Sequence, residues 1–151
     1  MSDARQVCTF TLDGLHFGVD VTLVQEVNRH QALTRVPLAP REVGGLINLR
    51  GRIVTAIDLR RRLGLPDRPP GRLPMNVVVR CGDLVHSLLV DEVGDVLTVD
   101  DGAFEPPPET LEAGARELIL GAYKLSDRLL LELDVLRSTS MEAGEVQPGE
   151  K

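Results

Sequence analysis

The chain has 151 residues and a mass of 16.5 kDa, a size that allows one domain or two very small ones. A net charge of −6, a pI near 5.1 and only four aromatic residues argue against general binding to nucleic acids or anionic membranes. The two cysteines are far apart, and no segment approaches the ~20 apolar residues of a membrane span. The sequence therefore predicts a cytoplasmic protein with no direct membrane insertion.

The N-terminal part predicts a β-hairpin followed by a short helix. Residues 7–12 and 15–19 are largely apolar and flank Asp13-Gly14, a dipeptide that favours a tight turn. Asp20 is a suitable helix N-cap, and valines at positions 21, 24 and 27 then follow with the spacing of one helix face. We expect two antiparallel strands and then a short helix that reaches Val27.

The middle of the chain predicts a second hairpin and a single helical turn. Residues 46–49 and 53–57 are apolar strands on either side of Arg50-Gly51-Arg52. Asp58 is placed to cap a helical turn over residues 60–63, which Gly64 would end. Several prolines between residues 66 and 74 then predict a stiff, exposed connection.

The C-terminal half predicts further short strands. Residues 75–79 and 84–90 form a hairpin pattern, and residues 93–99 continue the sheet. A proline-rich loop is expected over residues 100–114, with a helical turn at 109–111, before a last hairpin over residues 118–133. From residue 137 onward the apolar pattern ends, so we expect one folded domain over residues 7–136 and a disordered tail over 137–151.

No pattern typical of an enzyme is present. His16, His30 and His86 have no metal-ligand spacing, and Cys8 and Cys81 lie in or beside strands, where they are expected to be small core residues. Nucleophile, phosphate-loop and cofactor motifs are missing, so the sequence predicts a non-enzyme with no cofactor and no metal. The carboxylates of the later strands lack calcium-loop spacing and are expected to be solvated turn residues: Asp91, Glu92, Asp95, Asp100 and Asp101.

One concentration of positive charge leaves an alternative open. It consists of Arg50, Arg52, Arg60, Arg61 and Arg62. These residues would suit a small nucleic-acid-binding β-barrel, although the acidic chain and the scarcity of aromatic residues count against it. The simpler interpretation is a hairpin and a helical turn whose arginines are solvated.

The sequence TRVPLAPREVGGLINLRGRIVTAIDLRRRLGL at residues 34–65 resembles the CheW family of chemotaxis adaptors. The family pattern leads from a proline-punctuated segment to GLINLRG, here at 45–51, and then to IDLR at 57–60. Segments on both sides are also similar to the family: FTLDGLHFGVDVTLVQEV before this stretch, and LLVDEVGDVLTV and LILGAYKLSDRLLLELDVLRS after it. The resemblance covers residues 7–136, nearly the whole expected domain.

The resemblance implies a fold, a function and partners. The fold would be all-β, with two small SH3-like five-stranded β-barrel subdomains and short helices. The protein would be a non-catalytic adaptor that couples the tips of methyl-accepting chemoreceptors to the regulatory domain of a CheA-type histidine kinase. A groove between the two barrels would suit a receptor helical hairpin.

The resemblance also implies a set of partner-binding residues. A glutamate and an arginine that the family places side by side match Glu26 and Arg50, for which the alternative is two unrelated surface charges. The other matched positions are Val24, Gly45, Asn48, Val90 and Val93. Valines on strands also commonly serve a core, and a glycine at position 45 could equally be a backbone requirement at the start of a strand.

Overall fold

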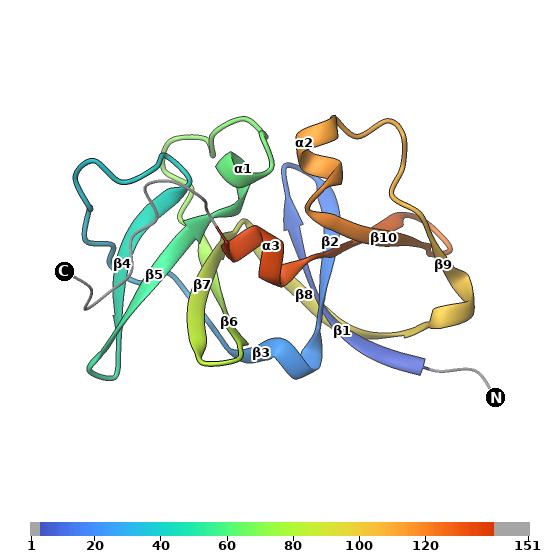
Figure 1. Cartoon of the computed structure of the whole chain (residues 1–151), viewed down its shortest axis with the longest axis horizontal. Coiled ribbons are helices and arrows are strands. Elements are labelled where there is room, and N and C mark those ends of the chain that lie inside the picture. Colours follow the sequence, from blue (N-terminus) through green and yellow to red (C-terminus); the bar gives the residue numbers. More distant parts are fainter. Residues whose placement is uncertain (1–3, 141–151) are drawn as a thin grey trace.

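The computed structural model describes residues 4–140 and consists of two curved sheets that lie side by side (Figure 1). In spatial order the six-stranded sheet contains β8 (Glu92–Asp100), β1 (Ala4–Leu12), β2 (Leu15–Asp20), β11 (Leu129–Leu133), β10 (Ile119–Lys124) and β9 (Phe104–Glu105). The five-stranded sheet contains β3 (Val24–Asn28), β6 (Met75–Cys81), β7 (Leu84–Val90), β5 (Arg52–Asp58) and β4 (Val43–Leu49). The predicted all-β fold with two subdomains is confirmed, but one sheet has six strands because the short β9 pairs with β10.

Both ends of the described chain contribute to one sheet. The N-terminal hairpin pairs with the C-terminal hairpin through parallel strands β2 and β11, in which Phe17 lies opposite Leu131. A second parallel pair, β5 with β7, joins the two hairpins of the five-stranded sheet. The middle of the sequence thus forms one subdomain, and the two ends form the other.

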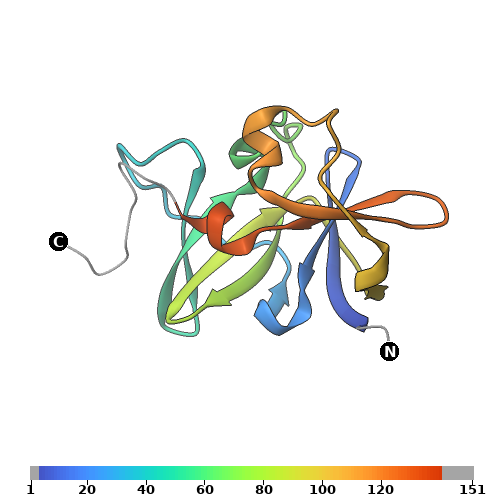
Figure 2. The same cartoon turned by 45° about the vertical axis from the view of Figure 1, so that its right-hand side comes forward.

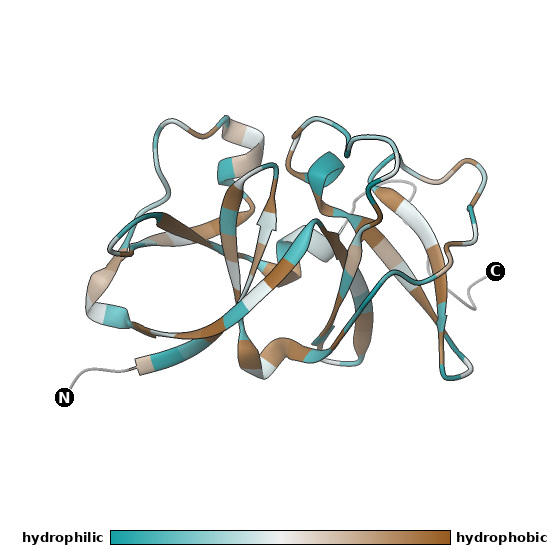
Figure 3. Ribbon diagram, turned by 180° about the vertical axis from the view of Figure 1, so that it is seen from behind, coloured by the Kyte–Doolittle hydropathy of each residue, from teal (hydrophilic) through white to brown (hydrophobic). Residues whose placement is uncertain are grey.

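The hydrophobic core lies mainly between the sheets. Its largest cluster combines Phe10 and Leu131 of the six-stranded sheet with Ile57 and Leu88 of the five-stranded sheet. Each sheet also encloses a smaller cluster of its own, one around Tyr123 and one around Ile47. Figure 3 shows hydrophobic residues throughout the strands of both sheets. Burial between the sheets therefore joins the two subdomains into one packed unit.

The expected helix over residues 21–27 is wrong beyond its first turn. A 3-10 helix, η1 (Val21–Leu23), begins at Asp20, whose Oδ1 accepts a hydrogen bond from the Thr22 amide at 2.9 Å. The chain then enters β3, which pairs antiparallel with β6. Valine has a high strand propensity. Pairing with the available edge of β6 therefore outweighs the helical tendency indicated by only three valines at helical spacing.

Three further short helices connect the strands. The first is α1 (Leu59–Arg62), which Asp58 caps as predicted. The second is η2 (Asp101–Ala103), and the third is α2 (Ala113–Arg116). The helical turn expected at residues 109–111 is a non-helical turn, and the helix forms four residues later.

The folded region extends beyond the predicted boundary at residue 136. Helix α3 (Val135–Thr139) lies between the two sheets in Figures 1 and 2. Ser138 and Thr139 are buried, and the Arg62 guanidinium donates hydrogen bonds to the carbonyl oxygens of residues 137, 138 and 140. The expectation of a tail from residue 137 is therefore wrong for 137–140, and residues 141–151 lie outside the described part of the chain.

No helix within residues 4–140 is long and apolar enough to cross a membrane.

Candidate functional site

The β4–β5 hairpin carries the residues of the GLINLRG motif. Leu49 pairs with Arg52, which leaves Arg50 and Gly51 as a two-residue turn with φ values of 52° and 86°. Two positive φ values define a type I′ turn, whose twist matches that of paired strands. The side chain of Asn48 accepts a hydrogen bond from the Gly51 amide at 2.8 Å. Asn48 thus holds the turn that presents Arg50.

Arg50 and Glu26 form the contact that the resemblance predicted. Arg50 Nη1 lies 2.7 Å from Glu26 Oε2, and Asn28 donates a hydrogen bond to Glu26 Oε1 at 2.9 Å. The Arg50 side chain is 78% exposed, whereas that of Glu26 is 18% exposed. The hydrogen bonds from Arg50 and Asn28 lower the pKa of Glu26, so this carboxylate remains ionised at neutral pH.

The same ion pair connects the two edges of the five-stranded sheet. Glu26 lies on β3 at one edge, and Arg50 lies at the end of β4 at the other. The contact therefore closes the curled sheet at this end with a charged group on its surface. We call Glu26, Asn28, Asn48 and Arg50 the Glu26–Arg50 cluster.

Gly45 is a backbone requirement of the strand next to this cluster. Its φ is +144°, and a Cβ atom there would lie 2.8 Å from the Thr34 carbonyl oxygen. Thr34 and Leu46 exchange two backbone hydrogen bonds of 2.8 Å across this close approach. Gly45 itself is buried. It therefore acts on the surface only through the position of the loop before β4.

None of the three valines is fully exposed. Val24 is half-buried at the start of β3 and packs against the core between the sheets. Val90 is fully buried in that core, and the partly buried Val93 pairs with Phe10. Val90 thus has no exposed surface for direct contact with a partner, which corrects its place among the expected binding residues.

The arginines from position 60 to 62 do not form a free basic surface. Arg62 donates hydrogen bonds to carbonyl oxygens at the C-terminal end of α3, and Arg61 Nε lies 3.1 Å from Asp67 Oδ1. Arg60 is buried, although the sequence predicted a solvated helical turn. Three of the five arginines of the predicted basic cluster are therefore engaged within the chain, which disfavours the nucleic-acid alternative.

The side chain of Asp91 is almost completely buried and accepts hydrogen bonds from several segments. Its Oδ1 accepts from Arg60 Nε at 2.9 Å and from Arg68 Nε at 3.1 Å. Its Oδ2 accepts from Arg60 Nη2 at 2.5 Å and from the Asp13 amide at 2.9 Å. The side chain of Asp91 is 6% exposed and that of Arg60 is 7% exposed. The expectation that Asp91 is a solvated turn residue is therefore wrong.

Electrostatics explains why a charge is tolerated at this position. Burial alone would raise the pKa of Asp91, but the hydrogen bonds from Arg60 and Asp13 and the charges of Arg60 and Arg68 outweigh burial and lower it. The only sequence signal was the position of Asp91 directly after the apolar end of a strand, and Glu92 follows it. Its partners lie 23 and 31 positions earlier in the chain.

Residues 4–140 contain no group of three His, Cys, Asp or Glu side chains placed to hold a metal ion. Both cysteines are free thiols, Cys8 buried and Cys81 partly buried. Burial raises the pKa of each, which makes the thiolate form less accessible at neutral pH.

Two β-sheets around a shared core define the chain as a small all-β protein. Its fold is similar to the crystal structure of the scaffolding protein TtCheW from Thermoanaerobacter tengcongensis, with a TM-score of 0.83 and 26% identity over 97% of this chain and 99% of that one. The family model of the CheW-like domain matches residues 6–142. The chain therefore belongs to the CheW-like domain family.

Curated relatives agree with this assignment. The probable chemotaxis protein CheW of Rhizobium etli is 34% identical over 142 residues, which are 92% of this chain and 92% of the relative. The chemotaxis protein CheW of Bacillus subtilis is 32% identical over 130 residues, covering 86% of this chain and 83% of the relative. The similarity thus extends over both sheets.

Proposed function

We propose that this protein is a non-catalytic adaptor of a chemotaxis-type signalling system, which couples chemoreceptor tips to the regulatory domain of a CheA-type histidine kinase. The match to CheW proteins along nearly the whole chain supports this proposal. We further propose that it acts in the cytoplasm, at arrays of receptors and kinase. Individually weak contacts would gain strength there because the partners are multivalent.

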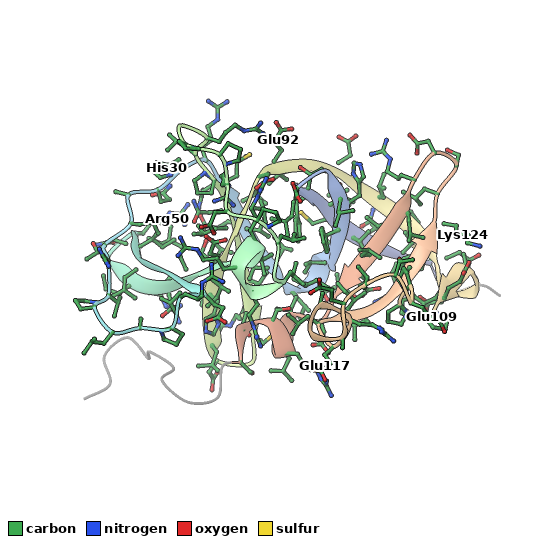
Figure 4. All side chains as sticks on the ribbon, turned by 90° about the horizontal axis from the view of Figure 1, so that it is seen from above. His30, Arg50, Glu92, Glu109, Glu117 and Lys124 are labelled. Carbon is green, nitrogen blue, oxygen red and sulfur yellow. The ribbon has the colours of Figure 1, made fainter. Side chains whose placement is uncertain are left out.

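The Glu26–Arg50 cluster is the observation that carries the proposed binding surface. Arg50 is a highly exposed guanidinium whose position is fixed by Glu26 and by a turn that Asn48 holds. Only Nη1 has an ion-pair partner among the described residues, so other N–H groups of the fork can donate to a partner. Figure 4 shows Arg50 in the half of the molecule that contains His30, away from Lys124 at the opposite end.

Arg50→Ala tests this surface. We expect binding to the kinase regulatory domain or to a receptor-tip fragment to weaken at least tenfold, because a fixed interfacial arginine is a typical binding hot spot. The melting temperature should change little, since the guanidinium is largely exposed. Arg50→Lys should restore little of the affinity because an ammonium cannot replace the planar fork. Isothermal titration and a thermal melt measure both quantities.

Arg52→Ala is the matched control. Arg52 is an exposed arginine on the same hairpin and makes no ion pair within residues 4–140. Its removal changes net charge equally, so we expect less than a threefold effect on either affinity. Equal losses for the two variants would show a general charge effect, and an unfolded or fully active Arg50→Ala protein would contradict the proposed role.

A further inference from the structure

Leu38 combines full exposure with a backbone conformation that leucine disfavours. Its relative exposure is 103%, and its φ is +65°. The Ala39 amide donates a hydrogen bond to the Val36 carbonyl oxygen at 3.4 Å, which places Pro37 and Leu38 at the centre of a β-turn. A proline followed by a residue with positive φ is typical of a type II turn, in which glycine or asparagine is preferred at the second position. A leucine there costs conformational free energy and gains no burial among residues 4–140.

The turn is held firmly by its surroundings. Thr34 exchanges two backbone hydrogen bonds with Leu46 on one side, and the Val43 amide donates to the Pro40 carbonyl oxygen at 2.9 Å on the other. Pro37 and Pro40 restrict the backbone between these anchors. The exposed side chain is therefore presented in a fixed position, as expected where strain serves a function.

The loop around Leu38 has a charge opposite to that of the whole chain. Residues 29–42 contain three arginines and one histidine but only one acidic residue, whereas the chain has a net charge of −6. Arg35 and Arg41 lie with Leu38 around a surface hollow of about 600 Å³. An apolar side chain with arginines beside it complements an apolar socket that is bordered by carboxylates.

We propose that Leu38 is an anchor residue that inserts into such an acid-bordered apolar socket on the kinase regulatory domain. This inference rests on the proposed adaptor function and adds a contact to it. A single projecting side chain requires a depression in its partner, and β-barrel mouths provide such depressions. The six-stranded sheet of this chain offers an example of such a depression, a hollow of about 450 Å³ lined in part by Phe10, Leu97 and Leu125. Asp95 lies at its border, whereas Asp127 there is paired with Arg128.

Leu38→Asn separates anchoring from folding because the two effects have opposite signs. Asparagine tolerates a positive φ, so the melting temperature should rise by about 2–4 °C. Loss of the apolar side chain should weaken binding of the kinase regulatory domain at least tenfold. Leu38→Ala retains the unfavourable φ and should weaken binding similarly without the gain in melting temperature.

Leu73→Asn is the control, since Leu73 is a 64% exposed loop leucine without a positive φ. It should change neither melting temperature nor affinity. If the wild-type protein binds the kinase regulatory domain and Leu38→Asn binds it with the same affinity, the anchor alone is overturned. If the wild-type protein does not bind, the proposed function is overturned as well. Self-association in sedimentation that Leu38→Asn abolishes, with kinase binding intact, would assign the anchor to a second copy and overturn this proposal.

Discussion

At the scale of single residues, Asp91 is the charged residue with the largest predicted effect on stability. It lies between β7 of one sheet and β8 of the other, and its amide donates to the Thr11 carbonyl oxygen at 3.0 Å. Its carboxylate neutralises the buried Arg60 and also binds Arg68. Arg68 Nη2 is buried without a hydrogen-bond partner among the described residues. No further acceptor is therefore at hand for this guanidinium if the carboxylate charge of Asp91 is removed.

Asp91→Asn should therefore destabilise the protein strongly. The substitution keeps the shape of the side chain but leaves buried guanidinium charge without compensation, which typically costs about 3–5 kcal/mol. Urea denaturation measures the loss. Asp95→Asn is the control, because Asp95 is an exposed carboxylate of β8 and should change stability by less than about 0.5 kcal/mol. Similar losses for the two variants would contradict the proposed role of Asp91.

The free energy of unfolding that Asp91 contributes relative to asparagine should depend on pH. Because the pKa of this carboxyl is lowered in the folded state, its contribution is present above the unfolded pKa of ~4 and declines as pH falls through the lower folded pKa. The difference in unfolding free energy between wild type and Asp91→Asn should thus be constant from pH 5 to 7 and shrink below pH 4. A difference that grows on acidification would show that the carboxyl has a raised pKa instead.

At the scale of elements, the sequence predicted those β-hairpins whose strands are joined by a short local turn. The hairpins at Asp13-Gly14 and Arg50-Gly51 were found because the turn residues lie between apolar strands. The parallel pairs β2–β11 and β5–β7 have no local signal, since each joins strands separated by other elements. The Arg50–Glu26 contact came from the family resemblance, whereas Asp91 was missed because acidic residues are rarely buried.

Gly45→Ala tests whether this residue serves the scaffold. Both Gly45 and Gly51 have positive φ, but a Cβ atom at position 45 meets the Thr34 oxygen, whereas one at position 51 has open space around it. Gly45→Ala should cost about 1–3 kcal/mol in unfolding free energy and reduce the exchange protection of the Leu46 amide. Gly51→Ala should cost less and leave that amide protected. Equal costs would contradict the close approach.

Two truncations test the end of the folded region. Removal of residues 142–151 should leave the melting temperature unchanged, because their sequence is polar and rich in glutamate and glycine. Truncation after residue 136 should lower it by several degrees, because it removes buried Ser138 and Thr139 and the carbonyl acceptors of Arg62. Equal melting temperatures would mean that α3 contributes nothing to stability.

At the scale of the whole molecule, the shared core determines how the two sheets unfold. Phe10, Phe17 and Leu131 pack in the same cluster as Ile57 and Leu88, so neither sheet can lose its structure without exposing the core of the other. An adaptor that binds two partners depends on this coupling, because the shared core fixes the geometry between its surfaces. The shared core fills the interior of the junction, so the groove for a receptor helical hairpin remains a prediction about the outer surface of the junction.

We therefore expect a single unfolding transition for both sheets. The calorimetric and van't Hoff enthalpies should agree, and near-UV circular dichroism of Tyr123, the only tyrosine, should report the same midpoint as far-UV circular dichroism. Leu88→Ala in β7 and Leu131→Ala in β11 should each lower stability by about 2–5 kcal/mol, because each leaves a cavity in the shared cluster. Each variant should lower the midpoint of unfolding while the two sheets still unfold in a single transition. If Tyr123 in the six-stranded sheet retains its signal while Leu88→Ala unfolds the other sheet, the two subdomains are independent and the shared core does not couple them.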